Sequence, residues 1–420
     1  MNLFSIQHIE AGEILDSRGN PTVLATVELA GGSKAASAAP SGASKGKLEA
    51  MELRDNNPGR YNGMGVLKAC SNVNVRIADV LAGMDAQDQE AIDRSMIQLD
   101  GSRHKSRIGA NAILSVSQAV AKAVAMQRKL PLFQSLQETF SLPKSTELPI
   151  PIMNLVNGGK HASTNVVIQE FQITFRPGRS AEQHIRAGSE VFHALAQVLS
   201  KARLDTDVGN EGGYSPDFAS IDDVFTFIVQ AIEQAGYEPG KDIMLGIDAA
   251  ADSFYHKGRN QYWLAPPERK LSPIELADTY LRWAETYPIV SIEDPFHEEA
   301  WDDWSAFVSR FSGKSRMVIG DDLLVTDQTR IAQAADEDAV SAVLIKPNQI
   351  GTITETVEAV RLAQSRDLKV IVSHRSGETD DTFITDFAVA VGAQYLKAGA
   401  PSRGERVAKY NRLLRISKEQ

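Results

Sequence analysis

Six short apolar segments in the second half of the chain each end at a charged or ionisable residue. Their lengths suit buried strands, and successive end residues are 23 to 45 positions apart, enough for one strand-plus-helix unit. Because the carboxyl ends of parallel strands in a closed barrel meet at one mouth, we expect six side chains to converge there: Asp248, Glu293, Asp321, Lys346, His374 and Lys397. Packing alone does not offset the cost of gathering so many ionisable groups. The pattern therefore predicts an α/β barrel with an active site at its mouth.

The beginning of the chain follows a different pattern. Residues 4–6 and 22–29 are predicted to form strands, the second with alternating polarity. Helical patterns come next, and residues 109–129 predict a long, alanine-rich amphipathic helix. The polar stretch 134–147 predicts a linker. We therefore divide the chain into two domains, residues 1–140 and residues 141–420.

Composition narrows the functional class. The chain has 420 residues, 43% of them hydrophobic, and a net charge of −10. The negative net charge argues against a general nucleic-acid binder, because such a protein needs a basic face. A lone cysteine, Cys70, precludes an intramolecular disulfide. The first dozen residues lack a signal-peptide pattern and no apolar run has membrane-spanning length. We expect a cytoplasmic enzyme.

Three of the six end residues are carboxylates, namely Asp248, Glu293 and Asp321. Oxygen ligands without a cysteine or histidine pair nearby favour Mg²⁺ over Zn²⁺. Lys346 and Lys397 follow in the same register, and a lysine beside a metal loses its proton readily enough to act as a general base. Acids at strand ends also occur without function because polar loops begin there. The combination of acids and lysines favours the catalytic interpretation.

Seven motifs give the chain a resemblance to the enolase family over nearly its whole length. They occur in the order and spacing of that family, at residues 16–22, 40–44, 109–114, 169–171, 291–296, 346–351 and 373–379. The resemblance implies an N-terminal α+β domain, then an enolase-type (β/α)8 barrel whose first units depart from simple βα repetition. It also implies a homodimer or higher homo-oligomer and a phosphorylated hydroxy acid as the small-molecule substrate.

The same resemblance implies a reaction and a set of residue roles. The reaction is the Mg²⁺-dependent, reversible dehydration of 2-phosphoglycerate to phosphoenolpyruvate, a step of glycolysis, with two Mg²⁺ ions per site. Asp248, Glu293 and Asp321 would hold the first ion, and Ser44 would hold the second against the substrate phosphate. The remaining roles are removal of the C2 proton by Lys346, charge stabilisation by Lys397, protonation of the C3 hydroxyl by Glu211 with support from Glu170, phosphate binding by Arg375 and Ser376, and substrate contact by His161, Gln169 and His374.

Three positions near the mouth depart from the usual enolase pattern. Lys45, Lys160 and Asn210 stand where threonine, serine and aspartate are usual, and each change makes the local charge more positive by one unit. One interpretation is variation on the loops of an ordinary enolase. The other is a paralogue for a larger or more anionic substrate, such as a carboxyphosphonoenolpyruvate synthase of a phosphonate pathway.

Two further classes fit the sequence less well. A mandelate-racemase or muconate-lactonising relative would place a Lys-x-Lys pair on an early barrel strand, whereas residues 167–170 read Val-Ile-Gln-Glu. A non-catalytic binding protein would tolerate the loss of site residues, yet the expected set is complete. A separate binding role gives no signal in the sequence.

Overall fold

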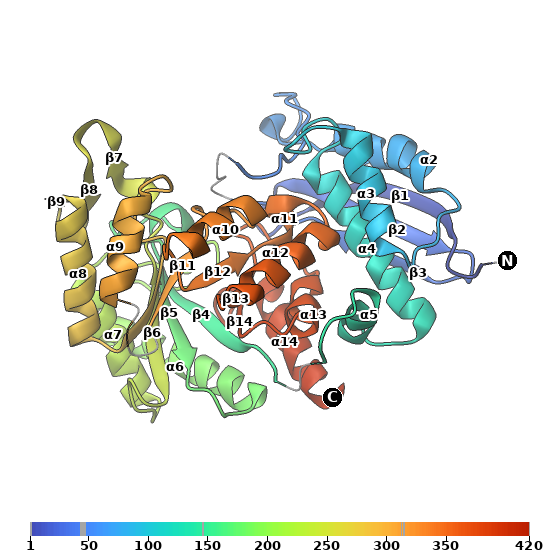
Figure 1. Cartoon of the computed structure of the whole chain (residues 1–420). Coiled ribbons are helices and arrows are strands. Elements are labelled where there is room, and N and C mark those ends of the chain that lie inside the picture. The colour runs from blue at the N-terminus through green and yellow to red at the C-terminus, as the bar shows by residue number, and fades with distance from the viewer. Residues whose placement is uncertain (1, 43–47, 145–146, 312, 314–315, 420) are drawn as a thin grey trace.

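The computed structural model describes residues 2–42, 48–144, 147–311, 313 and 316–419. Ser44 and Lys45 lie outside the described residues. Figure 1 shows an N-terminal domain, coloured blue to teal, beside a barrel domain coloured green to red. The expected combination of an α+β domain and a closed eight-stranded barrel is confirmed. None of the described helices is both long and apolar enough to cross a bilayer.

An antiparallel sheet of three strands begins the N-terminal domain. Its strands are β1 (Ile6–Leu15), β2 (Pro21–Leu29) and β3 (Lys34–Ala38), in the order β1-β2-β3. The predicted strand 22–29 is confirmed as β2, whereas the predicted strand 4–6 is wrong in extent and β3 was not predicted. β1 carries many polar side chains on its exposed face, so pairing with β2 rather than apolar alternation determines its length.

Helix α4 (Ala110–Arg128) confirms the position of the predicted helix but not its amphipathic character. Nearly all of its first four turns are buried, since one side packs against β2 and β3 and the other contacts α11 and α12 of the barrel. A helix covered on both sides is apolar all round. The other helices of this domain are α1 (Leu67–Ser71), α2 (Ala78–Leu81), α3 (Gln89–Asp100) and α5 (Leu132–Thr139).

The predicted linker 134–147 is wrong in its first half, because α5 extends to Thr139. Phe133 and Leu136 on this helix are buried, at 3% and 2% exposure. Of the two polar residues between them, Gln134 is partly exposed and Ser135 is buried, so a short helix with polar residues on its buried face resembles a loop in composition. Residues 145–146 of the predicted linker lie outside the described residues.

The barrel confirms all six predicted strands and adds two. Around the closed barrel the order is β10-β11-β12-β13-β14-β4-β5-β6. The strands are β4 (Ile150–Asn157), β5 (Glu170–Phe175), β6 (Ile243–Asp248), β10 (Ile289–Glu293), β11 (Met317–Gly320), β12 (Ala342–Ile345), β13 (Lys369–Ser373) and β14 (Tyr395–Lys397).

One strand departs from the parallel arrangement, as the resemblance implied for the first units. β5 pairs antiparallel with both β4 and β6, whereas the other neighbouring pairs are parallel. Glu170, the first residue of β5, therefore lies opposite Asp248, the last residue of β6. The reversal brings the amino end of β5 to the mouth where the other strands end.

Helices surround the barrel and cover its strands (Figure 1). They are α6 (Ala181–Lys201), α7 (Ile221–Gln234), α8 (Pro273–Thr286), α9 (Trp301–Phe311), α10 (Gln328–Asp336), α11 (Pro347–Ile350), α12 (Ile353–Ser365), α13 (Phe383–Ala390) and α14 (Gly404–Glu419). A small sheet of β7 (Tyr255–His256), β8 (Gln261–Leu264) and β9 (Arg269–Leu271) follows β6.

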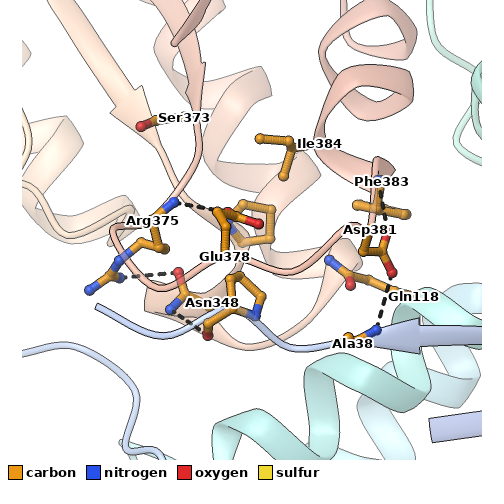
Figure 2. A pocket seen from close by; sticks show the side chains of 11 residues that line it. Ala38, Gln118, Asn348, Ser373, Arg375, Glu378, Asp381, Phe383 and Ile384 are labelled. Atoms are coloured by element: carbon orange, nitrogen blue, oxygen red, sulfur yellow. Dashed lines mark hydrogen bonds between the residues drawn. The ribbon is translucent and has the colours of Figure 1, made fainter. Parts of the chain in front are cut away.

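Polar contacts join the two domains beside the mouth. The ammonium of Lys122 on α4 lies 2.6 Å from a carboxylate oxygen of Asp381, which precedes α13. Asp381 also accepts hydrogen bonds from the Ser37 hydroxyl and from the Ala38 amide on β3, the latter drawn in Figure 2. These contacts fix the N-terminal sheet against the loop that follows β13.

Candidate active site

The six predicted end residues lie at the mouth of the barrel. Asp248, Glu293 and Lys397 are the last residues of β6, β10 and β14, while Asp321, Lys346 and His374 directly follow β11, β12 and β13. Apolar strand residues run up to each of them, so the barrel core determines where the polar side chains begin. All six are buried or nearly so.

A pocket at this mouth collects most of the expected site residues together with two acids that were not expected, Asp294 and Asp322. Its lining is His161, Gln169, Glu170, Glu211, Asp248, Asp294, Asp321, Asp322, Lys346, Ser373, His374, Arg375, Ser376 and Lys397.

Lys397 lies among three carboxylates. Its Nζ atom is 2.8 Å from Glu293, 3.2 Å from Glu170 and 3.4 Å from Asp248. Burial opposes the charge on this ammonium, but the three neighbouring carboxylates together raise its pKa well above the ordinary value. Lys397 is therefore a permanent cation, as its expected role in stabilising negative charge requires.

Lys346 forms an ion pair with Asp321, whose second oxygen accepts a hydrogen bond from the Gln349 amide at 3.0 Å. Burial disfavours the Lys346 ammonium, yet Asp321 outweighs that effect with help from Glu293 and raises the Lys346 pKa. While it is paired with Asp321, Lys346 is thus an acid rather than a base. A base role requires that another cation take its place beside Asp321.

The opposite side of the pocket holds Glu170, Glu211 and two histidines. Burial raises the pKa of Glu170, and the nearby Glu211 raises it further. Glu211 accepts a hydrogen bond from the Asn154 amide at 3.2 Å and lies 3.5 Å from Nδ1 of His161. Burial lowers the pKa of His161 to about 4, so its imidazole is neutral.

Nε2 of His374 lies 3.6 Å from Oε2 of Glu211. Its Nδ1 lies 2.6 Å from the guanidinium of Arg406, a donor, so Nδ1 is the acceptor and Nε2 carries the proton. Burial, followed by the charge of Arg406, lowers the His374 pKa well below its usual range. Arg406 also donates to the carbonyl oxygens of Arg375 and Ser376, which holds the loop after β13 in place.

Arg375 points a guanidinium into the mouth and is buried at 5% exposure. It donates at 3.1 Å to the side-chain oxygen of Asn348, as Figure 2 shows, and it forms a two-point ion pair with Glu49. Ser376, the other expected phosphate ligand, follows it and is also buried. Gln169, expected to line the site, donates at 3.0 Å to Asp248.

The acids of the mouth suit a hard cation. Burial, and then repulsion from Asp248, raises the Glu293 pKa well above its usual value, which shows that Lys397 compensates only part of the negative charge. Asp248, Glu293 and Asp321 offer oxygen atoms only, the donor type that Mg²⁺ prefers. Among the described residues, two groups hold ligand atoms within 4.8 Å of one another: His161 with Glu170 and Glu211, and Asp294 with Asp321 and Asp322.

The expected carboxylate trio is thus assembled at one mouth but is not one of these compact groups. Lys397 lies beside Glu293 and Asp248, while Lys346 and Gln349 hold Asp321. The two ammonium groups offset only part of the negative charge of the acids that we assign to the cation. Residues able to hold Mg²⁺ are therefore present, and acidic clusters support metal binding.

Besides Asp294 and Asp322, sequence reasoning missed three other contributors to the site. Glu49 and Arg406 contact expected site residues, and Asn154 holds Glu211. Asn154 lies within an apolar strand, where a buried amide is a detectable signal. Arg406 precedes Tyr410 and Leu413 by four and seven positions, so a charge within the apolar stripe of α14 is a detectable signal. Glu49 lies in a segment that mixes charged and apolar residues and gives no such signal.

The positions that depart from the enolase pattern have different environments. Lys160 is exposed beside the buried His161. The backbone amide of Asn210 donates to the backbone carbonyl of His161 at 2.9 Å, and the backbone carbonyl of Asn210 accepts from Arg406 at 3.1 Å. Asn210 thus connects the segments that carry His161 and Glu211.

Comparison with protein-family models gives two matches that together span most of the chain. Residues 6–136 match the enolase N-terminal domain, and residues 145–420 match the enolase C-terminal TIM barrel domain. The matches agree with the observed sheet, the barrel and its acidic mouth. Members of this family are Mg²⁺-dependent enzymes, and the chain belongs to the enolase family.

Proposed function

We propose that the protein is a phosphopyruvate hydratase that converts 2-phosphoglycerate to phosphoenolpyruvate and water. One observation carries the proposal: Lys346 lies on the opposite side of the barrel from Glu170, the neighbour of the proposed acid Glu211. Their strands, β12 and β5, are four places apart in the order of eight. An elimination that removes a proton from one face of the substrate and a hydroxyl from the other needs a base and an acid arranged in this way.

Lys346 takes the proton from C2 in its neutral form. Its position directly after β12 gives it a rigid attachment, which keeps the amine in register with the substrate. Lys397 remains charged beside Glu293 and provides a fixed positive group for the deprotonated carboxylate of the substrate.

Glu211 donates a proton to the departing C3 hydroxyl. Glu170, whose pKa is raised by burial and by Glu211, serves as the neighbouring proton reservoir. The neutral His161 and His374 lie on this side, 3.5 and 3.6 Å from the Glu211 carboxyl group, and their lowered pKa values make them weak competitors for its proton. Arg375 and Ser376 bind the phosphate at the edge of the mouth.

Asp248, Glu293 and Asp321 would hold one Mg²⁺ ion, and we assign a second to Ser44, which lies outside the described residues. Bound Mg²⁺ supplies positive charge that opposes protonation of Lys346 and balances the charge of the deprotonated substrate.

The deciding assay is the steady-state formation of phosphoenolpyruvate from 2-phosphoglycerate by the purified protein with Mg²⁺. We expect a kcat of about 10 s⁻¹ or more, the usual range for metabolic enzymes. A rate indistinguishable from that of the buffer would refute the proposed substrate while leaving the family assignment intact.

A second candidate is a paralogue that acts on a more anionic substrate, such as a carboxyphosphonoenolpyruvate synthase. The positions of Asn210, whose backbone contacts His161, and of the exposed Lys160 support it, because both substitutions add positive charge beside the acid side of the site. In that case 2-phosphoglycerate reacts slowly, a phosphonate analogue with an added carboxylate reacts faster, and Lys160→Ser with Asn210→Asp raises the 2-phosphoglycerate rate.

We also propose that the protein is cytoplasmic and assembles at least as a homodimer, as the family resemblance implies. Light scattering at micromolar concentration measures the assembly directly. A mass near 46 kDa would contradict it, since one chain has a mass of 45.7 kDa.

A further inference from the structure

Glu49 and Arg375 form a buried ion pair between the two domains. The distances are 3.0 Å from Oε2 of Glu49 to Nη1 of Arg375, 3.1 Å from Oε2 to Nη2 and 3.3 Å from Oε1 to Nη2. Their side chains are only 8% and 5% exposed. A guanidinium presents its donors as a planar fork, and a carboxylate that meets both nitrogens occupies that fork.

The environment of Glu49 places its charge next to the chemistry. Nε2 of Gln349 lies 3.4 Å from Oε1 of Glu49 and 3.0 Å from Oδ1 of Asp321, so one amide joins the two acids. Glu49 is also one of the charges that raise the pKa of Asp322, after burial and after Asp321. An anion bound on this side of Arg375 therefore meets the negative charge of Glu49.

The backbone after Glu49 is fixed on both sides. The Ala50 amide donates to the Gln349 carbonyl at 2.8 Å, and the Met51 amide donates to the His104 carbonyl at 2.7 Å. The segment that carries Glu49 is thus hydrogen-bonded both to the barrel and to the N-terminal domain, and this positions the Glu49 side chain beside Arg375. Figure 2 shows that Arg375 is itself held, since its backbone amide points to Glu378 and its guanidinium contacts Asn348.

We propose that Glu49 is a specificity-determining residue that occupies the anion position of Arg375 until a substrate dianion displaces it. The proposal rests on the role of Arg375 as a phosphate ligand in the proposed function. A buried guanidinium without a partner is costly, so Glu49 stabilises the ligand-free site. A phosphate dianion attracts Arg375 more strongly than a single carboxylate does, whereas a monoanion has no such advantage. The site thereby selects dianionic groups.

The test uses Glu49→Gln, which keeps the shape of the side chain and removes its charge. Inorganic phosphate is titrated into the purified protein by calorimetry with Mg²⁺ present. Because the competing like charge is gone, we expect phosphate to bind about tenfold more tightly than to the wild type. Selectivity for phosphate over acetate should fall, since a monoanion then also reaches Arg375.

Two variants serve as controls. Glu238→Gln removes the same charge from an exposed acid that pairs with Lys241 at 2.8 Å and does not line the mouth, so it should leave phosphate affinity unchanged. Glu49→Asp retains the charge and should stay closer to wild-type affinity than Glu49→Gln. If Glu49→Gln fails to fold, Glu49→Ala tests the same direction.

Equal or weaker phosphate binding by Glu49→Gln overturns the proposal, because Glu49 then only supports the position of Arg375. A gain that persists in the double variant Glu49→Gln/Arg375→Met also overturns it, since the phosphate would bind elsewhere. The proposed reaction is judged separately by phosphoenolpyruvate formation. Tighter phosphate binding in a protein that does not dehydrate 2-phosphoglycerate would uphold the role of Glu49 and refute only that reaction.

Discussion

Nζ of Lys397 lies 2.8 Å from Oε2 of Glu293, and both residues are the last residues of their barrel strands. The pair shows that the mouth balances its charge only in part: burial, and then repulsion from Asp248, raises the Glu293 pKa well above its usual value although Lys397 lowers it. The remaining negative charge is the basis of the metal prediction below.

Loss of one metal-binding carboxylate should abolish turnover. We expect Asp321→Ala to lower kcat by about a thousandfold, because metal-supplied charge stabilisation amounts to several kcal/mol. Excess chelator should inactivate the wild type, and added Mg²⁺ should restore it. The control is Asp336→Ala, an exposed aspartate on α10 that pairs with Arg366. Full activity in chelator would contradict the prediction.

The base and the acid should separate in an isotope-exchange experiment. Lys346→Ala should stop exchange of the C2 proton of 2-phosphoglycerate with deuterated water, measured by NMR. Glu211→Gln should slow dehydration but retain exchange, because its proton transfer belongs to the later step. Wild-type exchange rates in both variants would show that the roles are assigned wrongly.

The ion pair between Lys122 and Asp381 should contribute to the stability of the domain interface. Lys122→Met leaves a partly buried carboxylate with its Ser37 and Ala38 donors but without its cation, and we expect a loss of about 2 kcal/mol in the free energy of unfolding. Equilibrium unfolding in urea measures this change in the free energy of unfolding. Lys34→Met removes a lysine from an exposed pair with Glu10 and should change stability by less than about 1 kcal/mol.

Acid should destabilise the metal-free protein partly through His161. Its folded pKa of about 4 is below the ordinary value of 6.5, so the unfolded chain binds the extra proton first and stability falls as the pH drops from about 6.5 towards 4. At pH 5 the His161 side chain alone lowers the free energy of unfolding by roughly 2 kcal/mol relative to its value at pH 8.

The measurement is the difference between variants rather than the wild-type curve, because buried acids such as Glu293 have raised pKa values and act in the opposite direction. His161→Asn should lose less stability than the wild type between pH 8 and pH 5. His193→Asn, at an exposed position, should follow the wild type. Identical curves for all three proteins would show that His161 is not buried in its neutral form.

Local sequence determined the barrel strands and the residues at their ends. An apolar run stops where the strand reaches the mouth, so Asp248, Lys346 and Lys397 could be recognised from the chain itself. The motif order determined the family resemblance in the same way. Polarity alone was less informative for β1 and α5, because a half-exposed strand and a short amphipathic helix resemble loops in composition.

The tertiary structure decided what these residues contact. The reversed direction of β5 brings Glu170 opposite Asp248, and no periodicity in the sequence encodes strand direction. The pairing of Glu49 with Arg375 joins positions 326 residues apart, and it exists only because the N-terminal domain packs over the barrel mouth. Charge pairing depends on distances between segments remote in the chain, whereas strand formation depends on neighbours along it.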